Sequence, residues 1–328
     1  MKTILIIGGG LIGVACALRL QAAGVQATLV DPGDARRGAS YGNAGHIGSE
    51  QVTPWSAWSN VLRAPRSSFG AGGPLDFRWR DVALWGPWSA RFLGACAPAR
   101  FARGRAALTS LLAQALPAWQ RIADLAERPD LVIPHGHVTA WSTPRGAEHG
   151  LAAVAAAQWG AASYREMTRT ELARYEAVLA RPPEAAILFS GTGQVSDPQG
   201  AREAMLASFA ARGGEVLTAA AARVEANARV TLTNGAVREA EALLIAAGPW
   251  SRALMAQLGV NAPLIGERGY HLHSSETNWP HDLPTTVFEE NFIAVSRFTT
   301  GLRATSFVEF GSPDAPGDER KWRRLRKR

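Results

Sequence analysis

The sequence predicts an α/β protein with a second domain of α+β type, and three observations lead to that prediction. A short apolar run, a glycine-rich turn, a segment with helical spacing and a second apolar run follow one another within residues 3–31. Another apolar run at residues 241–251 ends in a Gly-Pro turn and indicates a buried strand followed by a helix. Residues 267–310 instead alternate and turn as antiparallel strands do. A length of 328 residues suits about two domains.

Three glycines between the first strand and the first helix indicate the chemistry of the first domain. In Gly8-x-Gly10-x-x-Gly13, the first glycine permits a tight turn, the second lets the backbone approach a pyrophosphate, and the third lets the helix pack on the strand. Asp31 ends the next strand, where a carboxylate can accept hydrogen bonds from an adenosine ribose and disfavours a 2′-phosphate. The pattern therefore predicts a Rossmann-like domain that binds NAD or FAD. A glycine-rich turn without a ligand is the alternative.

A second glycine-rich loop, GASYGNAGHIG at residues 38–48, favours FAD because a flavin can lie against backbone there. Together, IIGGGLIGVACALRLQAAGVQATLVD and ASYGNAGHI resemble the D-amino acid oxidase family of flavoproteins, most closely the bacterial D-amino acid dehydrogenases. The resemblance implies that Ser40 meets the pyrophosphate and that residues 43–46 lie near the flavin ring. Some relatives attach FAD through a histidine at the position of Gly42, so we expect non-covalent FAD.

The resemblance also implies a discontinuous domain order. We expect an FAD-binding domain at residues 1–55 and 190–250, an antiparallel-sheet substrate domain at 56–189 and 251–311, and a basic tail at 312–328. The expected cofactor contacts are Gly8, Gly10, Leu11, Ile12, Gly13, Asp31, Ser40, Asn43, Ala44, Gly45, His46, Val224, Ala247, Gly248 and Trp250.

Three local patterns predict structure in the middle of the chain. Residues 104–127 have helical periodicity that should break or kink at Pro117. Thr168 with Glu171 forms a capping box, and Asp197 before a proline starts a helix. Residues 131–143 predict a hairpin, with His135 and His137 on one face and no acidic or cysteine partner nearby in sequence. We therefore expect no metal site.

Oxidative deamination of a D-amino acid to a 2-oxo acid and ammonia is the activity that the resemblance implies. The electrons would pass to a quinone, another carrier or oxygen. Candidates to face the substrate are Arg268, Tyr270, His271 and Arg303, although a structural or surface role is the more common one for each of them taken singly. A non-catalytic FAD- or nucleotide-binding remnant and an NAD-dependent oxidoreductase are the alternatives.

Composition limits the classes of binding partner and the cellular compartment that we expect for this protein. The net charge is +7, but the last nine residues, RKWRRLRKR, hold seven basic side chains, so the rest of the chain is balanced. We expect no nucleic-acid partner and no membrane span. Cys16 and Cys96 lie outside any CxxC pair and read as reduced core residues. The expected location is the cytoplasm, with association at the inner-membrane surface left open. An N-terminal signal peptide is disfavoured by the interrupting glycines.

The tail has three interpretations. It could be a nucleic-acid arm, a membrane-surface segment, or the first turns of a charged surface helix. The family continues past this point with a segment that supplies a carboxylate-binding arginine and closes the FAD domain. We therefore interpret the tail as a surface helix in a chain that was cut short.

Overall fold

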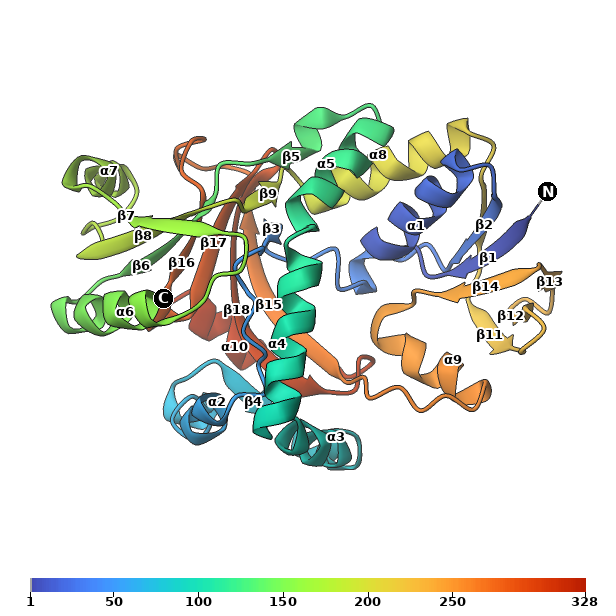
Figure 1. Cartoon of the computed structure of the whole chain (residues 1–328), viewed down its shortest axis with the longest axis horizontal. Coiled ribbons are helices and arrows are strands. Elements are labelled where there is room, and N and C mark those ends of the chain that lie inside the picture. The colour runs from blue at the N-terminus through green and yellow to red at the C-terminus, as the bar shows by residue number, and fades with distance from the viewer. Residues whose placement is uncertain (1) are drawn as a thin grey trace.

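The computed structural model describes residues 2–328, and its two domains lie at opposite ends of the molecule (Figure 1). The dinucleotide-binding domain contains the N-terminal strand, and the second domain contains a large twisted sheet with the C-terminus beside it. Among the described residues, no helix is long and apolar enough to cross a lipid bilayer. Both cysteines are free; Cys96 is buried, as the sequence predicts, whereas Cys16 is only half-buried.

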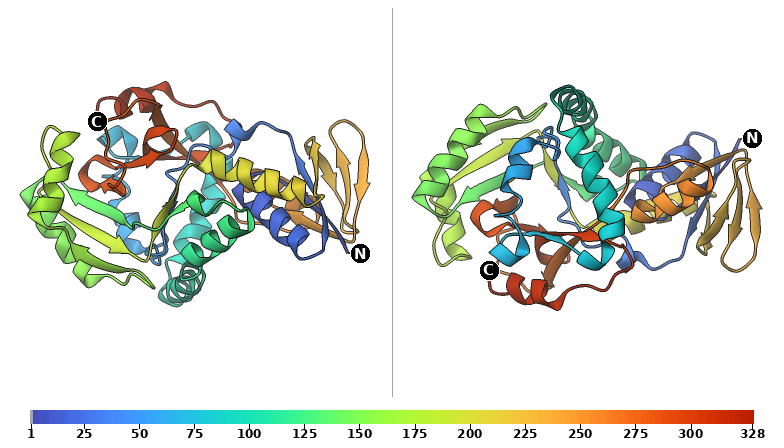
Figure 2. Two further views of the ribbon diagram at one scale, coloured as in Figure 1. Left: turned by 90° about the horizontal axis from the view of Figure 1, so that it is seen from above. Right: turned by 90° about the horizontal axis from the view of Figure 1, so that it is seen from below.

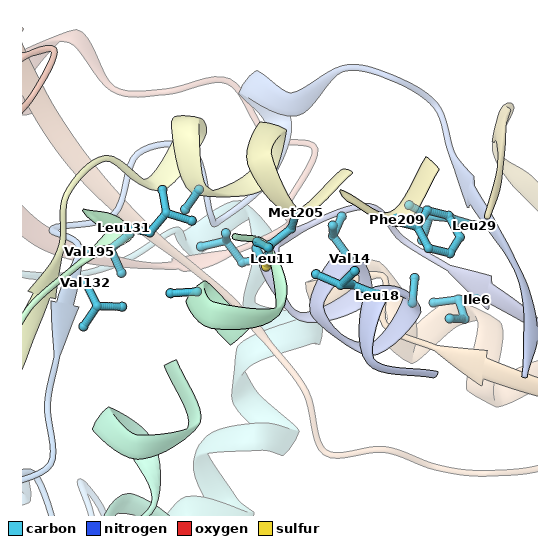
Figure 3. Packing of buried hydrophobic residues seen from close by; sticks show 14 of the residues in the cluster. Ile6, Leu11, Val14, Leu18, Leu29, Leu131, Val132, Val195, Met205 and Phe209 are labelled. Carbon is cyan, nitrogen blue, oxygen red and sulfur yellow. The ribbon is translucent and has the colours of Figure 1, made fainter. Parts of the chain in front are cut away.

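The first domain is built on a four-stranded parallel sheet, as expected. Its strand order is β10 (Glu215–Thr218), β2 (Gln26–Asp31), β1 (Thr3–Ile7), β14 (Ala242–Ile245). Two helices, α1 (Leu11–Ala22) and α8 (Pro198–Ala211), pack side by side on one face. Figure 3 shows Val14 and Leu18 of α1 against Met205 and Phe209 of α8, and all four are fully buried.

The opposite face of the parallel sheet packs on a small antiparallel sheet and a short helix. The sheet comprises β11 (Ala221–Val224), β12 (Arg229–Leu232) and β13 (Val237–Glu239), and the helix is α9 (Ser251–Gln257). Apolar side chains of β1 and β2 meet Val224, Val230 and Leu254 there. A turn at Asn234 and Gly235 joins β12 to β13, and Gly235 has a φ of 84°. Figure 2 shows these strands at the end of the molecule farthest from α6 (Pro144–Ala156).

The second domain is built on an eight-stranded, mainly antiparallel sheet. Its order is β15 (Gly266–Ser274), β18 (Gly301–Gly311), β17 (Ile293–Phe298), β16 (Thr285–Phe288), β6 (His137–Trp141), β8 (Ala185–Ser190), β7 (Ser163–Glu166), with β4 (Leu75–Phe77) beside β18. The predicted meander is present in β16–β17–β18. Two pairs, β16 with β6 and β18 with β4, are parallel, so the sheet is mixed.

The hairpin predicted at residues 131–143 is wrong. β5 (Val132–Ile133) pairs with β9 (Gly193–Val195), which also pairs with β3 (His46–Ile47), whereas β6 belongs to the large sheet. Between β5 and β6, Gly136 has a φ of 84°, and a side chain there would overlap the carbonyl oxygen of Phe189. The chain therefore leaves one sheet for another, and hydrophobic alternation alone does not reveal that change.

The local helix signals are confirmed. The long helical stretch divides into α4 (Pro98–Leu112) and α5 (Ala115–Leu125), with Pro117 in the first turn of α5. Thr168 and Glu171 form the complete capping box of α7 (Arg169–Ala173), and Asp197 accepts from the Gly200 amide at the start of α8. Helices α2 (Trp58–Arg63) and α3 (Val82–Ala95) precede α4 in the chain.

The basic tail is docked on the second domain and is not a purely surface helix. Helix α10 (Glu319–Leu325) packs against β15 and β18. Lys321 is 0% exposed, and its Nζ lies 2.6 Å from Asp76 Oδ2 and 2.5 Å from Glu309 Oε2. Leu325 is also buried. The arginines around them remain at the surface, so the sequence correctly indicates a helix but misses its buried side.

Candidate functional site

Each of the three motif positions is occupied by glycine for a different structural reason. Gly8 has a φ of 109°, and a side chain there would overlap the backbone of Ala246 at the end of β14. A side chain on Gly13 would overlap the carbonyl oxygen of Gly8. Gly10 is different, because its φ of −70° suits any residue and a Cβ would meet only Ser40 Oγ, at 3.2 Å. Packing therefore requires Gly8 and Gly13, whereas the absence of a side chain at Gly10 leaves open space beside the turn.

The start of α1 borders that space. The amides of a helix's first turn lack intrahelical acceptors and attract anions. Gly10, the N-cap, makes no side-chain cap bond, and the first turn contains no acidic residue. The Leu11 amide donates to Ser40 Oγ at 3.1 Å, so the second loop lies directly at this helix end. Ile12 is 72% exposed although its helix is otherwise well packed. These features suit a pyrophosphate.

The Asp31 side chain, at the end of β2, contacts the glycine-rich turn directly. Its Oδ2 accepts from the Gly9 amide at 2.6 Å and its Oδ1 from the Gly33 amide at 2.9 Å. Arg202 of α8 reaches the same place, with Nη2 3.6 Å from Asp31 Oδ1 and Nε donating to the Gly9 carbonyl. The carboxylate is therefore fixed where β2 ends. Sequence reasoning did not identify Arg202, because its separation of about 170 residues from Asp31 leaves no local signal.

The second glycine-rich loop is held in shape by its own side chains and by the large sheet. Asn43 Nδ2 donates to the Ser40 carbonyl at 3.0 Å, and the Gly45 amide donates to Asn43 Oδ1 at 2.8 Å. Ala44 is tied to β17, because its carbonyl accepts from Ser296 Oγ at 2.7 Å. Arg303 of β18 donates to the carbonyls of Tyr41 and Asn43 at 3.0 and 2.9 Å. The structure thus places Arg303 behind the loop, where it orders the backbone.

A pocket of about 400 Å³ lies where the two domains meet this loop. Three of the four predicted substrate-facing residues line it, together with two predicted cofactor contacts. These five residues are Arg268, Tyr270, His271, Asn43 and Trp250. Arg36 and Arg37 add two further guanidinium groups to its wall. The pocket therefore contains three guanidinium groups that can bind a carboxylate, beside the two carboxyl groups of Glu267 and Glu309.

The three candidates from β15 differ in how free they are. Arg268 donates through Nη2 to the carbonyls of Pro313 and Ala315, whereas its buried Nη1 has no hydrogen-bond partner among the described residues. Tyr270 is 2% exposed, and its hydroxyl donates to Glu309 at 3.1 Å. Burial raises the pKa of Tyr270, so its phenol stays protonated at neutral pH. Tyr270 therefore has a structural role in the wall of the pocket.

His271 lies directly against the second loop. A Cβ on Gly42 would lie 2.7 Å from His271 Nδ1, so Gly42 allows the imidazole to pack against the loop backbone. Burial lowers the pKa of His271, and the positive charge of Arg303 lowers it further. The ring is therefore neutral at physiological pH. Of the four predicted residues, His271 is the one that both lines the pocket and has a ring free of hydrogen bonds among the described residues.

The segment that follows β14, residues 246–250, lies beside the glycine motif and the pocket. Ala246 and Ala247 follow β14 and lie against the Gly8 turn, and Gly248 takes a φ of 55° before α9. Trp250 Nε1 donates to Asp314 Oδ1 at 3.1 Å, and the guanidinium of Arg37 lies 5.6 Å from the indole ring. The predicted Ala247, Gly248 and Trp250 are thus on the same side of the molecule as the motif.

Val224 lies away from that pocket, in a shallow hollow lined by residues 222–226 and Gln257. The Val224 amide donates to Gln257 Oε1 at 2.9 Å, and Gln257 Nε2 donates to the Ala222 carbonyl at 3.3 Å. The Gln257 side-chain amide thus already pairs with the backbone of this strand, where Val224 is predicted to contact the cofactor. Gln257 was not identified from the sequence.

His46 belongs to a different cluster, which the sequence analysis missed. His46 Nε2 lies 2.9 Å from Glu50 Oε1, and His137 Nδ1 lies 3.9 Å from the same oxygen. Burial lowers the pKa of His137 to about 3, and the nearby His46 lowers it too, so the ring is neutral. Burial raises the pKa of Glu50, but the hydrogen bond and charge of His46 outweigh it and hold that pKa below its usual value. His137 has no acidic partner nearby in sequence, but the fold brings Glu50 Oε1 within 3.9 Å of it.

The residues present fit a flavin dinucleotide. The open space at Gly10, the start of α1 with no acidic residue in its first turn, and the fixed Asp31 carboxylate suit the pyrophosphate and ribose. The ordered loop at residues 40–45 lies next to the pocket, where a planar ring can rest against backbone.

Comparison with known proteins agrees with this geometry. The sequence pattern of the FAD dependent oxidoreductase (DAO) family matches residues 3–328. A D-amino-acid oxidase of Bradyrhizobium diazoefficiens is 29% identical over 96% of this chain and 76% of its own length. A D-amino acid dehydrogenase of Rhizobium johnstonii is 26% identical over 93% of this chain and 76% of its own length. The chain thus spans about three quarters of the length of these relatives.

Solved structures show the same fold. Glycine oxidase from Geobacillus kaustophilus superposes with a TM-score of 0.63 at 17% identity, over 99% of this chain and 76% of that one. L-proline dehydrogenase from P. horikoshii gives a TM-score of 0.61 at 14% identity, over 99% and 75%. With a family match that covers nearly every residue and a fold shared with these enzymes, the chain belongs to the FAD dependent oxidoreductases of the DAO family.

Proposed function

We propose that this protein oxidatively deaminates D-amino acids with non-covalently bound FAD. The observation that carries the proposal is the placement of an arginine- and histidine-lined pocket directly against the loop that follows the dinucleotide motif. FAD, when bound, supplies the acceptor at N5 for the hydride that leaves the substrate α-carbon. The resulting imino acid takes up water to give a 2-oxo acid and ammonia. The printed names of the two curated relatives support D-amino acids as the substrate class.

In this proposal, residues of the first domain bind the cofactor and Arg303 orders the loop beside it. The start of α1, left open at Gly10, holds the pyrophosphate, and Asp31 accepts from the ribose hydroxyls. Arg303 keeps the loop backbone in one conformation by binding two of its carbonyls. Preorganisation of this kind avoids a reordering cost when the ligand binds.

Substrate binding falls to the β15 side of the pocket. Arg268 Nη1 is buried without a hydrogen-bond partner among the described residues, although Glu309 Oε1 lies 3.6 Å away, and a substrate carboxylate would give it a charge-assisted hydrogen bond. His271 is neutral, so it can accept a hydrogen bond from the substrate amine without adding positive charge. Oxidation of the substrate would leave two electrons on bound FAD, and a quinone, another carrier or oxygen would accept them.

Anaerobic reduction of the flavin tests the proposal. The purified chain is loaded with FAD and mixed with D-alanine, with L-alanine as the matched control, while the visible flavin band is recorded. We expect D-alanine to bleach the band and to yield pyruvate and ammonia. A yellow protein that no D-amino acid bleaches would instead be a non-catalytic FAD-binding chain. A colourless protein that enhances NADH fluorescence would point to a nicotinamide enzyme.

Two variants refine the assignment. Arg268→Met should raise KM for the D-amino acid by about 10- to 100-fold, because a charge-assisted hydrogen bond contributes roughly 1.5–3 kcal/mol. Arg238→Met, on the exposed strand β13, is the control and should leave KM unchanged. Comparing oxygen uptake with reduction of a soluble quinone identifies the electron acceptor.

A further inference from the structure

The cluster of His46, Glu50 and His137 joins one predicted cofactor contact, His46, to two residues that have no role in the proposed function. His46 lies on β3, Glu50 in the loop after it, and His137 at the start of β6. Their nearest ligand atoms all lie within 4.8 Å of one another. Glu50 and His137 are each 4% exposed. Two strands from different sheets thus bring two imidazoles and one carboxylate together in the interior.

The ring positions are fixed by packing. His137 stacks on Phe189 of β8, with ring centroids 4.8 Å apart and an interplanar angle of 5°. His46 meets His137 edge-on at 4.4 Å between ring centroids. His137 Nε2 lies 3.4 Å from Thr139 Oγ1, which leaves Nδ1 directed toward Glu50. A site held in this way is preorganised, because its side chains need not be reordered when a ligand binds.

Hydrogen bonds within the cluster leave several polar atoms unsatisfied. Glu50 Oε2, His137 Nδ1 and His46 Nδ1 are buried and have no hydrogen-bond partner among the described residues. A proton shared between His46 and Glu50 accounts for one carboxylate oxygen only. At 3.9 Å, His137 Nδ1 is too far from Glu50 Oε1 for a hydrogen bond. Buried polar groups without a partner are rare and call for one.

We propose that His46, Glu50 and His137 bind a divalent transition-metal ion, with zinc as the best match. Two imidazoles and one carboxylate are a recognised zinc ligand set with a fourth position left for water. Zinc bonds of about 2.0–2.1 Å in a tetrahedron separate neighbouring ligand atoms by roughly 3.4 Å. The two separations from Glu50 Oε1, 2.9 and 3.9 Å, lie on either side of that value, and all three ligand atoms lie within 4.8 Å of one another, so side-chain shifts would bring them into a zinc coordination sphere.

A second acidic cluster provides a useful contrast. Asp76, Glu309 and Asp318 also converge, but the ammonium of Lys321 lies among them and supplies the positive charge. No lysine or arginine among the described residues forms a salt bridge with Glu50. The cation position is therefore filled by the protein in one cluster and left to a ligand in the other.

Cobalt titration tests the site on the full chain without added FAD. Co²⁺ in a tetrahedral nitrogen and oxygen site gives visible d–d absorption, and Zn²⁺ should abolish that absorption by competition. We expect one Co²⁺ per chain. Glu50→Gln and His137→Asn should each weaken binding by at least about 100-fold, because changes even to supporting residues of metal sites cost 10–100-fold. His149→Asn, an exposed histidine on α6, is the matched control and should bind as the wild type does.

X-ray absorption on the zinc-loaded wild type keeps the inference testable if a variant does not fold. The expected first shell contains two imidazoles and oxygen, with no sulfur. A first shell with sulfur from Cys16 or Cys96, or cobalt binding equal in the wild type and in folded Glu50→Gln protein, would overturn the assignment. Because these readouts need neither FAD nor an amino acid, they stand apart from the test of the proposed function.

Discussion

Replacing Lys321 by methionine should strongly destabilise the second domain. The ammonium is 0% exposed and lies 2.6 Å from Asp76, 2.5 Å from Glu309 and 3.5 Å from Asp318. Removing one partner of a buried ion pair costs about 3–5 kcal/mol, because the other charge stays buried without compensation. Glu309 retains Arg268 at 3.6 Å, so we expect the lower end, about 3 kcal/mol.

Urea denaturation followed by tryptophan fluorescence measures this loss. The double variant Lys321→Met with Glu309→Gln should be less destabilised than the sum of the single variants, by about 1–3 kcal/mol, because residues in one ionic network couple. Lys327→Met, exposed at the end of the chain, is the control and should change the free energy of unfolding by less than about 0.5 kcal/mol. If Lys321→Met were no more harmful than Lys327→Met, the docking of α10 through its buried lysine would be refuted.

The same contribution should depend on pH in a defined direction. Burial lowers the pKa of Lys321, but hydrogen bonds to Asp76 and Glu309 outweigh this and raise it above 10.5. A raised folded-state pKa means that the contribution is fully present below the unfolded pKa and is lost as the pH rises through the folded value. The difference between wild type and Lys321→Met should therefore be constant from about pH 7 to 9 and shrink above about 10.5.

Three further changes test the site and the fold. Gly10→Val should fold but bind FAD at least about 100-fold more weakly, because about two charge-assisted hydrogen bonds are lost. Equal FAD affinity for Gly10→Val and wild type would refute the motif assignment. Gly13→Ala should instead reduce the folded yield measured by circular dichroism, because its side chain would overlap the Gly8 carbonyl oxygen. Burial raises the pKa of Tyr175 to about 12, so its phenol should ionise near pH 12 in a wild-type minus Tyr175→Phe ultraviolet titration, and stability should fall above about pH 10, where the unfolded state ionises first. Thr168→Ala should lower the free energy of unfolding by about 1 kcal/mol in urea, and no change would show that the α7 cap is dispensable.

Features set by neighbouring residues were predictable from the sequence. The strand, turn and helix around Gly8 follow from glycine's access to positive φ and from close packing within about ten residues. The caps at Thr168 and Asp197 follow from side chains that bond amides three residues away. Asp31 could be placed because parallel strands order their ends along one edge. Each of these depends on short-range sterics or hydrogen bonds that the order of residues specifies.

Contacts between distant segments needed the tertiary structure. The separation of β5 from β6 depends on which strands each one meets, and alternation of apolar residues does not specify partners. The burial of Lys321 depends on Asp76 and Glu309, and the partnership of Arg202 with Asp31 crosses most of the chain.

The sequence by itself determined a dinucleotide-binding α/β domain, its glycine motif and its helix ends, because local backbone geometry encodes them. Only the tertiary structure decided that Arg303 supports a loop, that Arg268 and His271 face one pocket, and that His46, Glu50 and His137 converge. The physical reason is that charge and hydrogen-bond partners are chosen in space after the sheets have formed. A histidine that looks isolated along the chain can therefore have a carboxylate within 4 Å in the fold.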